Sequence, residues 1–305
     1  MLPGLAAAGA VAGLAAAGVA WALVEARMYT VREVAVPLLP PGSDPIRLLH
    51  ITDLHLVPSQ ARKRAWIRDL AHLEPDVVID TGDNLAHQDA VPAVLDALEP
   101  LLALPGAFVM GSNDYYGPIP KNPTRYLRRD PRSGGSSDHY ALPTAELTAG
   151  FTAAGWRDLS NRRDWFDVGG VRFALVGVDD PHIHRDRFPA ETEAEPASDV
   201  RLGVTPAPFR RVLDQMHLDG AELILAGHTH GGQLCVPGVG ALVTNCDLDR
   251  GRVKGLHGWP GLRPDQSGGA ASTWLHVSAG LGTSPYAPVR FACRPEATLV
   301  ELVAR

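Results

Sequence analysis

The chain has 305 residues, of which 45% are hydrophobic and 20% charged, as is typical of a folded globular protein. Its length fits one large α/β domain. The net charge of −6 at pH 7 argues against a nucleic-acid partner, because nucleic-acid-binding domains are usually basic.

The N-terminal segment is the first predicted element. Residues 5–24 are 20 residues without a charge, about what a helix needs to cross the hydrocarbon core of a membrane. We therefore expect residues 1–27 to be a membrane anchor, which makes the protein a single-pass protein of the cell membrane. The alternative is a signal peptide cleaved at Ala20-Trp21-Ala22, although the positively charged start of such a peptide is missing.

The next part of the chain alternates between predicted strands and helices. Residues 28–45 are proline-rich and are expected to connect the anchor to a domain over residues 46–305. Predicted strands at 46–51, 77–79 and 108–110 alternate with predicted helices at 59–73 and 89–102, capped by Ser59 and Asp89. This order favours a largely parallel sheet.

A loop with five basic residues follows, from Gly117 to Pro143. Its basic residues are Lys121, Arg125, Arg128, Arg129 and Arg132. Two interpretations are open. It is either a solvated loop or a basic lid that binds a phosphate or an anionic lipid surface.

The second half of the chain is richer in strands. Residues 165–168 and 171–178, joined by two glycines, predict a β-hairpin. A helix is expected at 206–216, a strand at 222–226, a loop at 251–272, and closing strands at 275–278 and 299–303. We expect Cys235, Cys246 and Cys293 to be free thiols, with a Cys235–Cys246 bridge as the alternative in an oxidising compartment.

Metal-ligand side chains follow four of the apolar runs. They are Asp53, His55, Asp83, Asn113, His228 and His230. Open α/β sheets bind their ligands at the carboxyl ends of strands. Mixed carboxylate, amide and imidazole donors suit iron, manganese and zinc. The sequence therefore predicts a metal site.

The order of these motifs resembles the calcineurin-like metallophosphoesterase family. The motifs are Asp53-Leu54-His55, Gly82-Asp83, Gly111-Ser112-Asn113-Asp114 and Gly227-His228-Thr229-His230. The chain is most similar to the membrane-anchored bacterial branch, including the tail from Gly280 to Pro285 and Val289-Arg290-Phe291. The resemblance implies a four-layer α/β/β/α sandwich and a phosphoester hydrolase with two divalent ions of manganese, iron or zinc.

The resemblance also implies the role of each ligand. Asp53, His55, Asp83 and His230 would hold the first metal, with Asp83 shared between both. His228 and the amide of Asn113 would hold the second. Asp83, Asn113 and His228 are accordingly the expected catalytic residues.

The chain departs from the family pattern at two positions. The family's third motif is Gly-Asn-His-Asp or Glu, so a contiguous alignment puts Ser112 at the asparagine and Asn113 at the histidine that protonates the leaving group. A further histidine ligand is expected where the chain has Pro206. We therefore expect a weak second metal that Pro206→His would strengthen; otherwise His182 is the first candidate to fill the vacancy.

The expected partners are a phosphorylated small-molecule or lipid substrate and the membrane, and no protein partner is inferred. The alternative function is a degenerate family member that binds a phosphorylated ligand without turnover. Membrane orientation stays open. Arg27 and Arg32 favour a cytoplasmic domain, whereas the resemblance implies an external one. Asp180 is expected either to support the ligands or to cap its strand.

Overall fold

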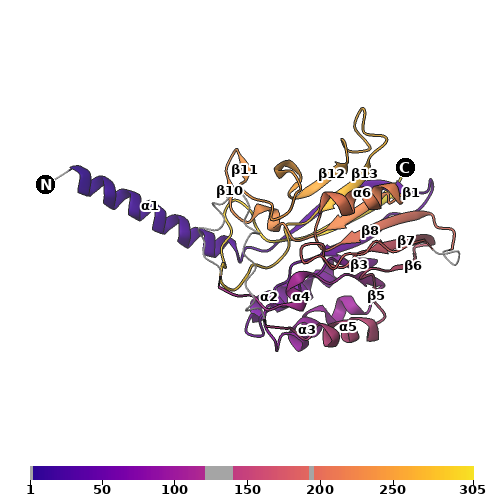
Figure 1. The fold of residues 1–305 in the computed structure, drawn as a ribbon, viewed down its shortest axis with the longest axis horizontal. Helices are drawn as coiled ribbons and strands as arrows, with labels where there is room; N and C mark the ends of the chain where they lie inside the picture. Colours follow the sequence, from indigo (N-terminus) through magenta and orange to yellow (C-terminus); the bar gives the residue numbers. More distant parts are fainter. Residues whose placement is uncertain (1–2, 121–139, 192–195) are drawn as a thin grey trace.

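Two six-stranded sheets form the centre of the protein in the computed structural model, which describes residues 3–120, 140–191 and 196–305 (Figure 1). The first sheet contains, in spatial order, β1 (Thr30–Leu39), β14 (Glu296–Ala304), β2 (Ile46–Ile51), β3 (Val77–Asp80), β4 (Gly106–Phe108) and β5 (Arg157–Asp158). The second contains β12 (Gly255–Trp259), β13 (Thr273–Val277), β9 (Leu223–Ala226), β8 (Val200–Thr205), β7 (Val171–Gly177) and β6 (Arg163–Val168). A small hairpin pairs β10 (Cys235–Val236) with β11 (Gly240–Ala241).

Each sheet has a parallel centre. β2 to β5 are parallel neighbours in the first sheet, as the alternation of strands and helices predicts. In the second sheet β7, β8, β9 and β13 are parallel. The carboxyl ends of the central strands therefore lie along one edge of each sheet, where a ligand site is expected.

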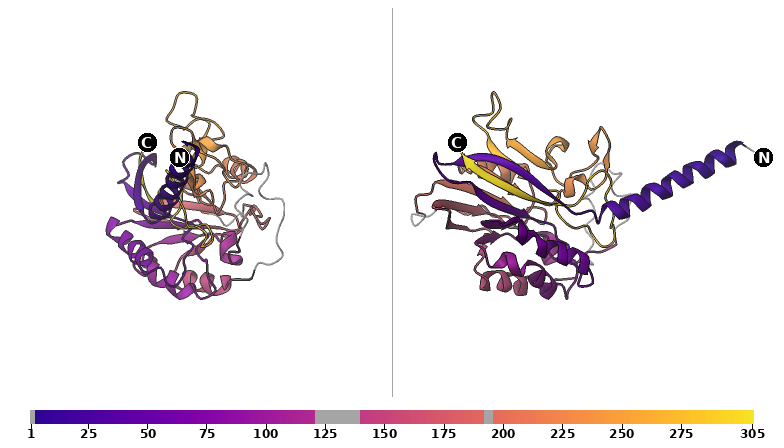
Figure 2. Two further views of the ribbon diagram at one scale, coloured as in Figure 1. Left: turned by 90° about the vertical axis from the view of Figure 1, so that its left-hand side faces the viewer. Right: turned by 180° about the vertical axis from the view of Figure 1, so that it is seen from behind.

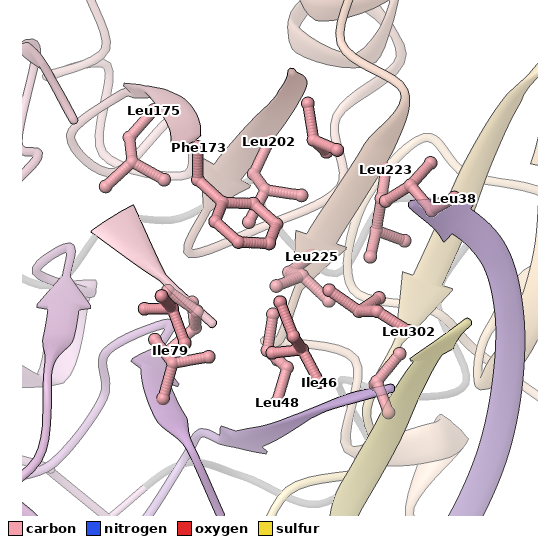
Figure 3. Close-up of a cluster of buried hydrophobic side chains, with 14 of the residues drawn as sticks. Leu38, Ile46, Leu48, Ile79, Phe173, Leu175, Leu202, Leu223, Leu225 and Leu302 are labelled. Carbon is pink, nitrogen blue, oxygen red and sulfur yellow. The ribbon is translucent and has the colours of Figure 1, made fainter. Parts of the chain in front are cut away.

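The sheets pack face to face on a buried apolar core. Strand periodicity places Leu48 between the sheets and its neighbour Leu49 on the outer face. Leu223 and Leu225 point into the same core from β9, whereas Ile224 points outward. Figure 3 shows leucines, isoleucines and a phenylalanine of both sheets meeting there.

Helices cover the outer faces of the sheets. The first sheet is covered by α2 (Ala61–Asp69), α3 (Val91–Leu102) and α5 (Thr144–Ala153), and the second by α6 (Arg210–Leu218). Short helical turns are α4 (Ser112–Tyr115), η1 (Leu70–Leu73), η3 (His230–Gly232) and η4 (Arg250–Arg252). The result is a mixed α/β fold with helices outside two central sheets, seen from two further directions in Figure 2.

Several predicted helix boundaries are wrong. The N-caps of α2 and α3 are Gln60 and Ala90 rather than Ser59 and Asp89. The side chains of Gln60 and Ala90 make no capping hydrogen bond. The predicted helix at 206–216 begins only at Arg210. Pro208 disfavours helical backbone at Ala207, the residue before it, and Phe209 is the extended N-cap.

Two segments predicted to lack strands contain them. The expected connector, residues 28–45, includes β1, which pairs in parallel with β14 at the edge of the first sheet. An edge strand tolerates Pro37, and the register shifts just after it. The expected loop at 251–272 includes η4 and β12, which pairs antiparallel with β13.

The N-terminal helix α1 (Pro3–Glu25) extends away from the body of the protein (Figures 1 and 2). Within the residues described, no helix combines the length and apolar character needed to span a bilayer. The last turn of α1 is tied to the domain. The carboxylate of Glu25 accepts hydrogen bonds from the backbone N–H groups of Ala292 and Cys293, at 3.0 and 2.7 Å.

The hairpin of β6 and β7 is confirmed, with Gly169 and Gly170 at φ of 58° and 78° in its turn. Such a turn needs positive φ at both central residues, which glycine adopts without strain. The predicted basic lid is a different case. Lys121, Arg125, Arg128, Arg129 and Arg132 lie outside the described residues.

Candidate metal centre

The six predicted site residues all follow strands at one edge of the sandwich. Asp53 and His55 follow β2, Asp83 follows β3, and Asn113 follows β4. His228 and His230 follow β9 in the facing sheet. A hydrogen bond of 3.0 Å from the His228 backbone N–H to Asp53 Oδ2 joins the two groups.

Five of these residues have a left-handed backbone that side chains other than glycine rarely adopt. Their φ angles are 51° at Asp53, 41° at His55, 58° at Asp83, 72° at His228 and 49° at His230. Each such residue costs of order 1–3 kcal/mol and persists only where its surroundings hold it. Their clustering at one edge marks this edge as the functional site.

The donors of Asp53, His55 and His230 lie within 4.8 Å of one another. The Nε2 atoms of His55 and His230 are 3.3 Å apart, and His230 Nε2 is 3.6 Å from Asp53 Oδ1. Asp83 Oδ2 adds a fourth donor, 3.8 Å from His55 Nε2. Three donors thus lie together, and Asp83 lies beside one of them, His55.

Burial sets the charge of these donors. Desolvation lowers the pKa of His55 to about 4 and that of His230 well below its usual value, so both imidazoles are neutral near pH 7. Desolvation, reinforced by the charge of Asp83, raises the pKa of Asp53. Neutral imidazoles beside crowded carboxyl groups form a donor set that a divalent cation would satisfy, so these residues fit a metal ion.

His230 is oriented from behind. Its Nδ1 lies 3.1 Å from the carbonyl oxygen of Gly282 and 3.3 Å from a guanidinium nitrogen of Arg290, and these contacts fix the ring with Nε2 toward Asp53. Arg290 is fully buried and donates to the carbonyl oxygens of Ala279, Gly280 and Gly282 at 2.7–3.0 Å. The guanidinium therefore holds the loop against which His230 rests.

Asp114 organises the turn that carries Asp83. Its Oδ2 accepts the backbone N–H groups of Asp83 and Gly111, both at 2.9 Å. Its Oδ1 accepts those of Asn84 and Leu85, at 2.7 and 3.2 Å. Burial followed by the charge of Asp83 raises the pKa of this carboxyl group. One side chain thus joins the turns after β3 and β4.

Asn113 contacts Asp83, whereas the backbone of His228 contacts Asp53. The Asn113 backbone N–H donates to Asp83 Oδ1 at 2.7 Å, and its amide Nδ2 donates to Asp83 Oδ2 at 2.9 Å. The ring of His228 has its Nε2 3.3 Å from the carbonyl oxygen of Asn245. Asn113 is therefore held against the expected shared carboxylate.

A seventh residue, His182, lies beside His228. The ring of His182, from the loop after β7, lies 4.7 Å from the ring of His228, centroid to centroid. Asp180 Oδ1 accepts the backbone N–H of His182 at 2.5 Å, and Asp180 Oδ2 accepts that of Ser112 at 2.5 Å. Asp180 thus ties the loop after β7 to the turn that carries Asn113.

Sequence reasoning missed the supporting groups. Asp114 and Arg290 entered it only as letters of a motif and of the tail, because the partners of both are backbone atoms. His50 and His276, which no local pattern singles out, are buried and joined through their Nδ1 atoms at 2.9 Å. The three cysteines are free thiols, and the neighbour of Cys235 is Cys293, not Cys246.

Comparison with known proteins gives a family match. The model of the calcineurin-like phosphoesterase family matches residues 46–232. An uncharacterised metallophosphoesterase of Aquifex aeolicus is 26% identical over 274 residues, 87% of each chain. Phosphodiesterase YaeI of Escherichia coli is 27% identical over 266 residues, 85% of this chain and 83% of that one. A Bos taurus transmembrane protein with a metallophosphoesterase domain is 28% identical, over 90% of this chain and 57% of that one.

Proposed function

Because the chain belongs to the calcineurin-like phosphoesterase family, and is thus a hydrolase of phosphoester bonds, we propose that it is a phosphodiesterase that uses two divalent metal ions. The observation that carries the proposal is the convergence of Asp53, His55 and His230 donors within 4.8 Å. The relative named as a phosphodiesterase, similar over most of its length, supports a diester over a monoester.

In this proposal Asp53, His55, Asp83 and His230 hold the first ion. Asp83 also serves the second ion, together with Asn113 and His228. When bound, two such ions lower the pKa of a bridging water and stabilise charge on the phosphoryl oxygens. The protein supplies a rigid frame for this chemistry, because Asp114 and Arg290 fix the turns that carry the ligands.

The side chain at Asn113, where the resemblance implies a histidine, cannot protonate the leaving group. The side chain that follows Ser112 is the amide of Asn113, which cannot act as a general acid near neutral pH. Loss of a general acid typically costs 10²–10⁴-fold in rate for a leaving group that needs a proton. We therefore propose that the enzyme favours diesters with acidic leaving groups.

A graded series of diesters tests this function. Purified, metal-loaded protein is assayed on aryl methyl phosphates whose phenol leaving groups span a range of pKa, with p-nitrophenyl phosphate as the monoester. We expect hydrolysis of the diesters, with a rate that falls steeply as the phenol becomes less acidic. A flat dependence would show that another group donates the proton, and a preference for the monoester would contradict the substrate class.

The second candidate function is binding of a phosphorylated ligand with little turnover. Asn113 and Pro206 favour it, since each replaces an imidazole that the resemblance implies. Metal content equal to that of an active enzyme, with no hydrolysis of any phosphoester in a broad panel, would favour this candidate over the first.

We also propose that residues 5–24 hold the protein at the cell membrane, with its substrate a phosphorylated small molecule or a lipid-linked phosphoester. The support is the uncharged stretch of 20 residues, the extension of α1 away from the body, and a relative named as a transmembrane protein (Figure 1). The bond from the Arg290 backbone N–H to the carbonyl oxygen of Ala22, at 2.9 Å, favours an uncleaved chain, because cleavage after Ala22 would separate this contact from α1.

A further inference from the structure

The loops after β7, β8 and β9 emerge side by side. In the register of the second sheet Gly177 pairs with Val204, and Thr205 pairs with Ala226. The loop after β9 carries His228, two residues beyond Ala226. The loop after β8 therefore begins beside the loop that carries His228.

The first residues of the loop after β8 have no side chain that can bind a metal. Its first residues are Pro206, Ala207 and Pro208, whose side chains carry no nitrogen or oxygen, and all three are buried. The hydroxyl of Thr205 is used within the loop, because it donates to the carbonyl oxygen of Ala207 at 2.9 Å. A metal ion beside His228 would therefore gain no side-chain ligand from the first residues of this loop.

The loop after β7 brings an imidazole to the same place. His182 is half-buried, with its ring 4.7 Å from the ring of His228. Phe209 packs against both, with ring centroids 6.3 Å from His182 and 6.4 Å from His228. The backbone of the loop is fixed by Asp180, which accepts the N–H groups of His182 and Ile183 and holds the turn of Ser112 with its other oxygen.

We propose that His182 is the ligand that replaces the missing histidine at Pro206, so that the second divalent ion is held by Asp83, Asn113, His228 and His182. The inference rests on the proposed two-metal function. It explains how the chain keeps a second site without a donor on β8, by taking an imidazole from the neighbouring loop. It also reverses the sequence-based expectation of a weak second metal.

The test measures metal binding as well as turnover. Full-length wild type, His182→Ala and His182→Gln are stripped with a chelator and titrated with Co²⁺. The ligand-field absorption is followed, and bound metal is counted by elemental analysis. We expect two tightly bound ions in wild type and one in each variant, with the second dissociation constant raised at least tenfold and the first unchanged. Circular dichroism spectra and melting temperatures check that the variants fold like wild type.

Two further variants sharpen the test. His184→Asn changes an exposed histidine two residues away, at φ of 59°, where asparagine is tolerated, and should bind metal like wild type. Pro206→His should restore the second ion in the His182→Ala background and add little to wild type.

Two tight ions in folded His182→Ala, with an unchanged cobalt spectrum, would overturn the role of His182 and leave the two-metal function standing. One tight ion in wild type would overturn it as well, because the second site would then be incomplete. Wild type that binds no divalent metal would overturn the proposed function itself, and the inference with it.

Discussion

Five of the candidate metal ligands share an unusual backbone conformation with positive φ. The five metal-ligand candidates with positive φ are spread over almost 180 residues of sequence, yet they share one edge of the sandwich. Left-handed backbone turns each side chain out of its strand direction, so that donors from neighbouring strand ends aim at one point. The cost is offset by hydrogen bonds to fixed carboxylates such as Asp114, which accepts the backbone N–H of Asp83.

Asp83→Asn is the residue substitution with the largest expected effect. The carboxylate would serve both ions, and an amide is a weaker, neutral ligand. We expect loss of at least one bound metal per chain and a fall in hydrolysis of 10³-fold or more, which corresponds to about 4 kcal/mol of transition-state stabilisation. Elemental analysis and turnover of bis-p-nitrophenyl phosphate measure both effects.

Asp80→Asn is the matched control for this substitution. Asp80 is also buried, three residues earlier at the end of β3, and burial raises its pKa to about 7. Its protonated form is mimicked by the neutral amide, and its Oδ1 accepts the backbone N–H of Gly82.

Full activity and full metal content in Asp83→Asn would end the two-metal interpretation.

The sequence was informative about the ligands themselves and uninformative about what holds them. Asp53 and His230 are recognisable because apolar runs precede them and their spacing matches a family pattern. Arg290 contacts backbone carbonyl groups of a loop that only the fold brings near, so no local pattern indicates its role. His182 follows a strand exit, which made it a reserve candidate, but its contact with His228 depends on the order of β7, β8 and β9.

At the scale of elements, the turns after β3 and β4 act as one unit through Asp114. Asp114→Asn keeps the volume of the side chain but removes a charge and one acceptor, so two of four buried N–H groups lose their partner. An unsatisfied buried donor costs about 1–3 kcal/mol, so for two donors we expect a loss of about 2–6 kcal/mol in unfolding free energy. Urea unfolding of the metal-free protein measures this loss.

The same substitution should also weaken metal binding, because the position of Asp83 depends on this turn. Asp158→Asn is a suitable comparison, since Asp158 accepts one backbone N–H, that of Ser160 at 3.0 Å, and otherwise pairs with the exposed Arg162. It should cost about 1 kcal/mol. Equal losses in the two variants would argue against a special role for Asp114.

The two sheets are joined by a buried histidine pair, His50 of β2 and His276 of β13. Burial lowers the pKa of His276 to about 3 and that of His50 well below its usual value. The unfolded chain binds protons at these residues below about pH 6.5, whereas the folded chain stays neutral. Their contribution to stability is therefore present above this pH and is lost as pH falls from about 6.5 toward 3.

His276→Gln removes one of these titrations and keeps a side chain that can hydrogen-bond His50. The variant should be less stable than wild type at pH 7.5, and the gap should narrow by about 2 kcal/mol at pH 5.0, because wild type alone loses about 1.4 kcal/mol per pH unit at this residue. Urea unfolding at both pH values measures the gap. His72→Gln, at an exposed position of η1, should lose as much unfolding free energy between pH 7.5 and 5.0 as wild type does. An equal loss in His276→Gln would contradict the proposed role of His276.

For the whole molecule, strands in the centre were predictable and edges were not. The runs that became β2, β3 and β9 are apolar because both faces of their sheets are covered. β1 carries Arg32, Glu33 and Pro37, which fit an edge, and β12 lies in a glycine-rich segment that becomes a strand by pairing with β13. Pairing partners far apart in sequence decide such strands.

The proposed anchor is tested on the whole chain in its own cells. If α1 is retained in the membrane, the mature protein should begin at its first residues and stay in the membrane pellet through a carbonate wash. A matched chain lacking residues 1–20, which keeps Ala22 and Glu25 for their contacts with the 290–293 segment, should move to the supernatant. A mature chain that starts near Glu25 in the soluble fraction would favour the signal peptide.

The central claim is that hydrolysis depends on metal held by Asp53, His55, Asp83 and His230. Its most direct test is a titration of stripped, full-length protein with Mn²⁺, in which bound metal and turnover of bis-p-nitrophenyl phosphate are measured on the same samples. We expect no turnover without metal, two ions per chain at saturation, and a rate that rises as the second ion binds. Turnover by metal-free protein, or full occupancy with no turnover, would contradict it.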